Sequence, residues 1–149
     1  MDRIRVVVAD DHWTARAATR SLLERTEDID VVGEAGDGEE AIELVERLRP
    51  DVLVLDMDMP KVSGVGVVQR LASSCTAVKV LAHSGYDDEY YIYETLRDGA
   101  AGYLLKNDSP DKFLEAVRDA AKGKRGLLSQ PVQEKVGRLI SRKNGFSGA

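Results

Sequence analysis

Residues 52–60, VLVLDMDMP, decide how this sequence folds. The apolar run from Val52 to Leu55 has no polar interruption, which is typical of a strand that is buried on both faces of a parallel sheet. Asp56 follows the run directly, and Met59 and Pro60 then turn the chain. The pattern therefore predicts a central strand that presents a carboxylate at its carboxyl end.

Further short apolar runs lie before and after this one, and segments of helical period separate them. Such alternation along a chain is typical of a parallel sheet covered by helices. We expect an α/β fold, a flavodoxin-like (βα)5 doubly wound parallel five-stranded sheet, with the most polar strand, Asp30–Ala35, at an edge. The predicted strands are Ile4–Ala9, Asp30–Ala35, Val52–Leu55, Val78–His83 and Ala101–Leu105.

A helix is predicted after each strand. Apolar residues recur at intervals of three and four along segments that begin near Ala15, Ala41 and Gly64, so each segment is amphipathic. Tyrosines blur the apolar stripe of the fourth helix, which is expected from about Asp87 to Asp98. The sequence Ser-Pro-Asp at residues 109–111 is a start signal for the fifth helix.

The pattern changes after Gly123. We expect residues 1–122 to form one domain and residues 123–149 to be a linker, with a short helix near Gln130 to Arg142 and a disordered tail over Asn144–Ala149. The basic residues of that helix are too few for a DNA-recognition helix, so this chain itself is not expected to bind DNA. They are Lys135, Arg138, Arg142 and Lys143.

Length and composition narrow the class of protein. A chain of 149 residues suits one domain with an appendage, and a formal net charge of −5 disfavours general affinity for nucleic acid. Cys75 is the single cysteine, which excludes an internal disulfide framework and a thiolate zinc cage. The apolar start is too short for a signal peptide or a membrane span, so we expect a cytoplasmic protein with no membrane partner.

Polar side chains cluster at the predicted carboxyl ends of the strands. Asp10 and Asp11 follow the first strand, Asp56 the third, Ser84 the fourth and Lys106 the fifth. Ligands of doubly wound sheets bind outside this edge. Taken singly, each residue has a plainer explanation: the aspartates as helix N-caps, the serine as a loop cap and the lysine as a solvated side chain. The ordered set instead predicts one site.

The chemistry of that set points to phosphoryl transfer. Neighbouring carboxylates repel one another by roughly 1 kcal/mol per pair in water and by more when buried, so they need a cation. Oxygen ligands without a cluster of imidazoles or thiolates favour Mg²⁺ (or Mn²⁺) over zinc. A carboxylate nucleophile, a metal, an ammonium and a hydroxyl together are sufficient for transfer of a phosphoryl group.

The same residues resemble a known family. Asp10-Asp11-His12, Asp56 with Met59-Pro60 and Gly64, Ser84, and Gly99-Ala100 leading into residues 102–106 are similar to the receiver domains of NarL/FixJ-type response regulators, over about residues 3–122. The resemblance implies that a histidine kinase phosphorylates Asp56. It also implies a Mg²⁺ site formed by Asp11, Asp56 and the backbone carbonyl of Asp58, with Asp10 acting through water.

The resemblance also implies a switch. Lys106 would pair with the phosphate and Asp56, Ser84 would hydrogen-bond the phosphate and draw its loop inward, and Tyr103 would move inward and change rotamer, although a strand tyrosine can equally be a core residue. Asp58 and Tyr86 flank the site and would tune the phosphoryl lifetime.

The resemblance assigns no metal to His12, which we interpret as a local hydrogen-bonding residue. Trp13 would begin the first helix, either exposed toward a kinase or packed. Homodimers would form through the fourth helix, fifth strand and fifth helix, or through the first and fifth helices.

Two other functions remain open at this stage. VLVLDMD also resembles the nucleophile motif of haloacid-dehalogenase-type phosphatases, although that motif usually lies near the start of a longer chain. A receiver that binds partners independently of phosphorylation is the second. For a receiver we expect no turnover of an external substrate, and DNA binding only through an effector domain absent here. Residues 126–129, GLLS, resemble the linker before such a helix-turn-helix domain, so we expect truncation rather than a stand-alone receiver.

Overall fold

The computed structural model describes residues 2–74 and 76–147, with side chains described as far as Ser141. Its centre is a parallel sheet of six strands in the order β2-β1-β3-β4-β5-β6. The strands are β1 (Ile4–Ala9), β2 (Ile29–Ala35), β3 (Val52–Leu55), β4 (Lys79–Ser84), β5 (Gly102–Leu105) and β6 (Leu127–Leu128). The helices are α1 (Trp13–Leu23), α2 (Gly38–Leu48), α3 (Gly64–Ala72), α4 (Glu89–Arg97), α5 (Pro110–Ala121) and α6 (Gln130–Ser147).

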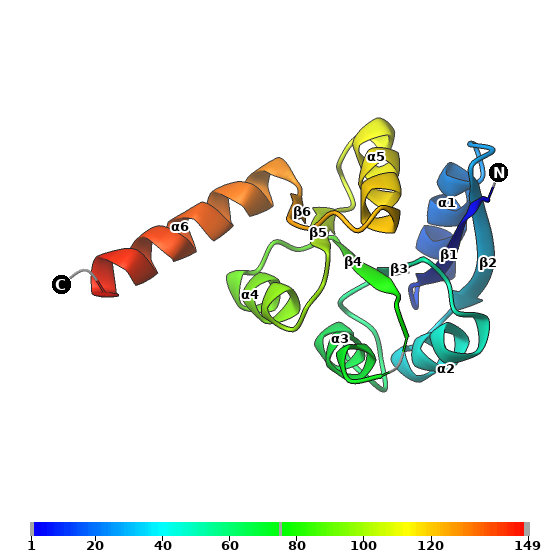
Figure 1. The fold of residues 1–149 in the computed structure, drawn as a ribbon, viewed down its shortest axis with the longest axis horizontal. Coiled ribbons are helices and arrows are strands. Elements are labelled where there is room, and N and C mark those ends of the chain that lie inside the picture. The colour runs from blue at the N-terminus through cyan, green and yellow to red at the C-terminus, as the bar shows by residue number, and fades with distance from the viewer. Residues whose placement is uncertain (1, 75, 148–149) are drawn as a thin grey trace.

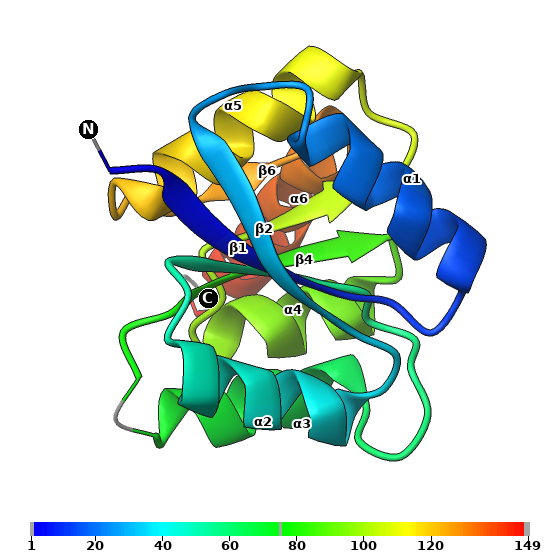
Figure 2. The ribbon, with the colours of Figure 1, turned by 90° about the vertical axis from the view of Figure 1, so that its right-hand side faces the viewer.

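Helices cover both faces of the sheet (Figures 1 and 2). Helices α1 and α5 lie on one face, and α2, α3 and α4 lie on the other. The flavodoxin-like α/β fold predicted from the sequence is thereby confirmed, with β2 at an edge and the first five strands within one residue of their predicted bounds. No helix within the described residues is both long and apolar enough to cross a membrane.

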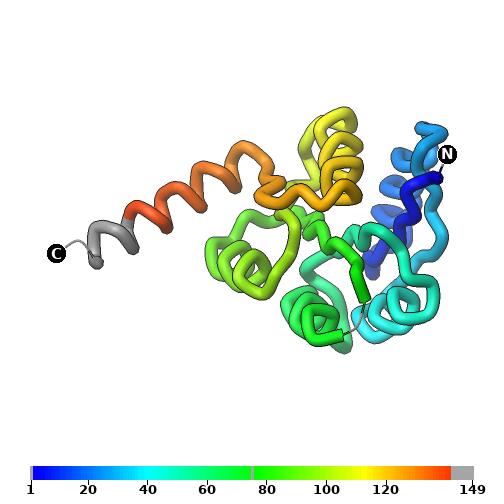
Figure 3. Tube along the Cα trace, viewed as in Figure 1, coloured from blue at the N-terminus to red at the C-terminus, as the bar shows by residue number. Residues whose placement is uncertain are grey.

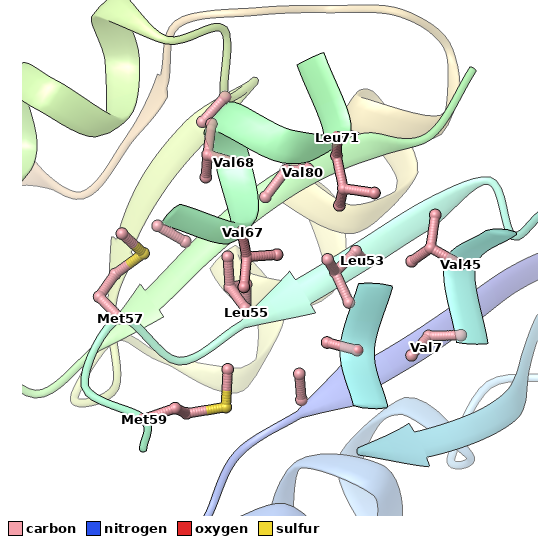
Figure 4. Close-up of a cluster of buried hydrophobic side chains, with 14 of the residues drawn as sticks. Val7, Val45, Leu53, Leu55, Met57, Met59, Val67, Val68, Leu71 and Val80 are labelled. Carbon is pink, nitrogen blue, oxygen red and sulfur yellow. The ribbon is translucent and has the colours of Figure 1, made fainter. Parts of the chain in front are cut away.

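Parallel register brings the carboxyl ends of the central strands together. Ala9 of β1 pairs with Leu55 of β3, and Leu55 pairs with Ala82 of β4. Beyond β3 the side chains alternate: Met57 and Met59 pack into the core beside Leu55 (Figure 4). The intervening aspartates of this segment are therefore directed away from that core cluster.

Gly64, at the start of α3, lets the segment after β3 lie close to the helix. A Cβ at this position would lie 2.6 Å from the Cα of Met57 and 2.8 Å from its sulfur, which is closer than atoms can approach. The glycine therefore fixes the path of the chain directly after Asp56.

The sheet has a sixth strand where the sequence indicated a linker. Leu127 and Leu128 pair with Gly102 and Tyr103 of β5. The pairing is close because Gly102 has no side chain: a Cβ there would lie 2.1 Å from the carbonyl oxygen of Leu127. A two-residue strand carries no recognisable periodicity, so the sequence pattern could not reveal it.

Helix α6 is longer than predicted (Figures 1 and 3). Its bounds, Gln130–Ser147, extend beyond the predicted end near Arg142, and the disordered tail over Asn144–Ala149 stays a prediction. No proline follows Pro131, and the backbone hydrogen bonding of the helix is therefore not interrupted. Residues 148–149 lie outside the described part of the chain, and the domain boundary after residue 122 stays a prediction.

Candidate functional site

Three aspartates meet at the carboxyl edge of the sheet. The amide of Asp56 donates to the carbonyl of Ala9 at 2.9 Å, and the amide of Asp10 donates to the carbonyl of Ala35 at 3.0 Å, so both aspartates continue the ladder of the sheet. Ligand atoms of Asp10, Asp11, His12 and Asp56 all lie within 4.8 Å of one another. The backbone of a rigid sheet therefore holds the acidic cluster that the sequence predicted.

Lys106 reaches this cluster from the end of β5. Its amide donates to the carbonyl of Ser84 at 2.8 Å, which fixes its backbone against β4. Its Nζ donates to Oδ2 of Asp10 at 2.7 Å and lies 3.8 Å from Oδ1 of Asp56. Among the described ion pairs, Lys106 is the one lysine or arginine on these two carboxylates, so a single positive charge serves both.

The two buried carboxylates differ in pKa. Burial raises the pKa of Asp56 to about 6, and the nearby charge of Asp10 adds to this, although the ammonium of Lys106 acts in the opposite direction. Burial also acts to raise the pKa of Asp10. There the hydrogen bonds from Lys106 and from the amide of His12 outweigh burial and hold the pKa below its ordinary value. Asp56 is thus the less stabilised anion.

His12 and Trp13 lie at the rim of the cluster. The amide of His12 donates to Oδ1 of Asp10 at 2.9 Å, and its Nδ1 lies 3.1 Å from Oδ1 of Asp11. This geometry supports the interpretation of His12 as a local hydrogen-bonding residue. Trp13 begins α1 with 70% of its surface exposed, so it is a surface residue and not part of the core.

The β4–α4 loop joins Ser84 to Tyr103. The buried Oγ of Ser84 accepts a hydrogen bond from the amide of Tyr86 at 3.1 Å, and the hydroxyl of Tyr103 donates to the carbonyl of Tyr86 at 2.9 Å. Tyr103 is fully buried. The inward position expected after activation is therefore the position that its ring already occupies, and no inward movement can start from this structure.

The flanking residues Asp58 and Tyr86 are both exposed. The amide of Asp58 donates to Oδ1 of Asp56 at 3.4 Å, so the loop turns back over the carboxylate. Tyr86 has 66% of its surface exposed beside Ser84. Both predicted tuning residues therefore border the site without being part of its buried centre.

Three more residues lie close to this site: His83, which the sequence marked only as a residue that could alter tuning, and Ser129 and Lys135, which it did not place here. His83 stacks on Phe113 with ring centroids 4.6 Å apart, and burial, followed by the charge of Lys106, lowers its pKa to about 4, so it is neutral at pH 7. Ser129 and Lys135, from the segment expected to be a linker, contact the loops after β5 and β4. Their contacts depend on residues far away in the chain, so no local pattern marks them.

Comparison with known proteins assigns the family. The model of the response regulator receiver domain matches residues 6–118. This chain belongs to the response regulator receiver family.

The relatives of this receiver are of the NarL/FixJ type. It is 42% identical over 122 residues to the transcriptional regulatory protein DegU of Brevibacillus brevis, covering 82% of this chain and 52% of that protein. It is 36% identical over 142 residues to the oxygen regulatory protein NreC of Staphylococcus haemolyticus, covering 95% of this chain and 65% of that protein. The chain thus spans about half to two thirds of the length of these relatives.

Solved structures agree. The signal receiver domain of the putative response regulator NarL from Mycobacterium tuberculosis matches with a TM-score of 0.81 and 39% identity, over 83% of this chain and 100% of that one. A LuxR-family response regulator from Aurantimonas sp. SI85-9A1 matches with a TM-score of 0.87 and 25% identity, over 94% of this chain and 99% of that one. The chain is therefore a receiver domain of a two-component response regulator.

The donor set of the receiver fits a divalent cation. Carboxylate oxygens of Asp10, Asp11 and Asp56 face one another, and only Lys106 offsets their charge in the described part of the site. Mg²⁺ prefers such hard oxygen ligands and completes its octahedron with water and phosphate. The family match also favours the receiver over the phosphatase interpretation of the VLVLDMD segment.

Proposed function

We propose that Asp56 accepts a phosphoryl group from the phosphohistidine of a histidine kinase. The observation that carries the proposal is the shared position of Lys106, whose Nζ lies 2.7 Å from Asp10 and 3.8 Å from Asp56. An ammonium between two buried carboxylates is placed to neutralise an incoming phosphate. With a pKa of about 6, Asp56 is mostly ionised at pH 7 and available as a nucleophile.

In this step a carboxylate oxygen of Asp56 attacks phosphorus. The new O–P bond forms as the P–N bond of the phosphohistidine breaks, and the histidine nitrogen keeps the electron pair and later gains a proton. Lys106 pairs with the transferred phosphate. Asp11, Asp56 and the backbone carbonyl of Asp58 would hold Mg²⁺ (or Mn²⁺), with Asp10 acting through water, and the bound ion would supply charge neutralisation.

Phosphorylation then changes the interaction surface. Ser84 hydrogen-bonds the phosphate and shifts its loop toward Asp56, and Tyr103, which is already inside, follows the loop through its bond to Tyr86. The altered surface of α4, β5 and α5 would control dimerisation, with α1 and α5 as the alternative dimer surface. Because the relative DegU is a transcriptional regulatory protein, we propose that the output is control of a DNA-binding effector.

Asp58 and Tyr86 are proposed to set the lifetime of the phosphoryl group. Asp58 lies two residues after the nucleophile, and its side chain is exposed. Its carboxylate can therefore repel or orient the water that hydrolyses the acyl phosphate. An unchanged phosphoryl half-life in Asp58→Asn would remove this role.

The decisive experiment is the intact mass of the protein after incubation with Mg²⁺ and acetyl phosphate. We expect a single phosphoryl adduct that is absent from Asp56→Asn and from a sample treated with EDTA. No adduct would favour a phosphorylation-independent binding module. Continuous hydrolysis of phosphate esters, many cycles per protein molecule, would instead favour a phosphatase.

A further inference from the structure

The loop between β4 and α4, residues 85–88, is held from two directions. From the sheet, Ser84 and Tyr103 bond the main chain of Tyr86. From α6, Nζ of Lys135 donates to the carbonyl of Asp87 at 2.8 Å and lies 3.3 Å from its carboxylate oxygen Oδ2. The residue next to Tyr86 is thus bonded to the C-terminal helix, and the Lys135 side chain is only 25% exposed.

Apolar packing of α6 is strong at its start and weak beyond. Val132 is fully buried, whereas Ile140, two turns later, has 54% of its surface exposed. Between α4 and α6 an open apolar groove of about 420 Å³ remains, lined on α4 by Ile92 and Leu96 and on α6 by Val136 and Leu139. In this middle part of α6, the bond from Lys135 to Asp87 adds a polar contact to the incomplete apolar one.

The start of α6 is also fastened to the loop after β5. Oγ of the buried Ser129 accepts from the amide of Leu105 at 2.8 Å and donates to the carboxylate of Asp108. Leu105 directly precedes Lys106. Ser129, directly before α6, and Lys135 within it therefore bond the segments next to Lys106 and Ser84, at the ends of β5 and β4.

We propose that Lys135 couples the docking of α6 to the phosphorylation state of Asp56, an inference that rests on the proposed function. Ser84 is three residues before Asp87. Between them, the amide and the carbonyl of Tyr86 are both hydrogen-bonded, so the segment from Ser84 to Asp87 moves as a unit. Movement of Ser84 toward a phosphate pulls Asp87 away from Lys135. The bond to Lys135 therefore favours the unphosphorylated loop, and phosphorylation loosens α6.

Coupling of this kind is reciprocal. If phosphorylation weakens the contact between α6 and the loop, then removal of that contact makes phosphorylation easier by the same factor in equilibrium terms. The contact between Lys135 and Asp87 consists of one partly exposed ion pair and one charged hydrogen bond. We therefore expect its loss to change the exchange rate of α6 and the phosphorylation rate by about threefold. Lys135 acts here as a positioning residue and does not touch the phosphate.

The test compares Lys135→Met with Lys124→Met in the whole chain. Lys124 is a matched control because its Nζ also pairs with one carboxylate, that of Asp119 at 3.5 Å, remote from the β4–α4 loop. Asp87→Asn is an intermediate variant, since it keeps the carbonyl acceptor and loses the carboxylate. The readouts are hydrogen exchange of the amides of residues 132–141 and the rate of phosphorylation by acetyl phosphate with Mg²⁺, followed by intact mass.

We expect phosphorylation to accelerate exchange in α6 of the unaltered protein. Lys135→Met should show about threefold faster exchange there without phosphorylation and about threefold faster phosphorylation, Asp87→Asn a smaller change in both, and Lys124→Met no change.

Two results would overturn the inference and leave the proposed function intact: an adduct that forms without faster exchange in α6, or equal phosphorylation rates in Lys135→Met and Lys124→Met. Failure of every variant to form an adduct would overturn the proposed function, and the inference would fail with it.

Discussion

The two edges of the same parallel sheet both carry charged residues, but they neutralise them differently. At the amino-terminal edge, Arg118 donates two hydrogen bonds to Asp28, at 2.7 and 3.2 Å, and both side chains are well exposed. At the carboxyl edge, Asp10 and Asp56 are buried and share Lys106. Asp28 at the first edge thus has an arginine of its own, whereas the buried aspartates at the second edge share one lysine.

The pKa values express the same difference. The hydrogen bond from Arg118 lowers the pKa of Asp28, whereas burial raises the pKa of Asp56 to about 6. An ionised Asp28 therefore stabilises the fold, and an ionised Asp56 destabilises it. The aspartates clustered at the carboxyl edge outnumber the lysine beside them, so a cation from outside the chain would lower their mutual repulsion.

The largest effect is expected from Lys106→Met. Loss of the shared ammonium removes the charge that would neutralise the phosphate and raises the pKa of Asp56 further, so phosphorylation by acetyl phosphate should slow by about a hundredfold. The matched change at the other edge is Arg118→Met, which should leave the rate unchanged. Comparable slowing in both variants would show that the lysine at the carboxyl edge is no more important for phosphorylation than the arginine at the amino-terminal edge.

The next effect concerns stability. Asp56→Asn should raise the free energy of unfolding by about 2 kcal/mol at pH 7.5, because Asn replaces an anion whose folded-state pKa lies above its unfolded value. The gain should disappear near pH 3, where Asp56 is protonated in both states. Urea unfolding at the two pH values measures it.

Asp28→Asn is the counterpart at the opposite edge and should have the opposite sign. Its carboxylate has a lowered pKa, so the stabilisation is present above the ordinary pKa and is lost as pH falls. Since the pair is exposed, the loss at pH 7.5 should be below about 1 kcal/mol. A gain of stability in this variant would contradict the proposed contrast.

Stabilisation by Mg²⁺ should be smaller than the gain from Asp56→Asn. At a concentration about ten times the dissociation constant, Mg²⁺ should stabilise the folded protein by about 1.4 kcal/mol, visible as a rise in Tm. Asp11→Asn should reduce the rise, and Asp51→Asn, at the amino-terminal edge where Asp51 accepts from the amide of Arg5, should retain it. Equal responses in the two variants would argue against a site at the carboxyl edge.

Local patterns predicted the strands and the residues that follow them. Continuous apolar runs identify buried parallel strands, and parallel strands bring their carboxyl ends together, so the meeting of Asp10, Asp56 and Lys106 followed from pattern alone. That Asp10 and Asp56 share the ammonium of Lys106 could not be predicted, because it depends on distances between side chains that spacing along the chain does not give.

What the sequence missed depends on contacts between distant residues. Strand β6 requires the absence of a Cβ at Gly102, which is 25 residues before Leu127. The bond between Lys135 and Asp87 spans 48 residues. Neither contact leaves a periodic signal, so the segment after residue 122 had the composition of a linker although it packs on the sheet.

Strand β6 also bears on aggregation. Leu127 and Ser129 donate their amides to the carbonyls of Ala101 and Tyr103, and the side chain of Ser129 accepts the amide of Leu105. These main-chain groups of β5 are thus already occupied within one molecule, so a second copy cannot extend the sheet by pairing with them. The edge on this side is then β6, and a strand of two residues offers little main chain for a second copy to pair with.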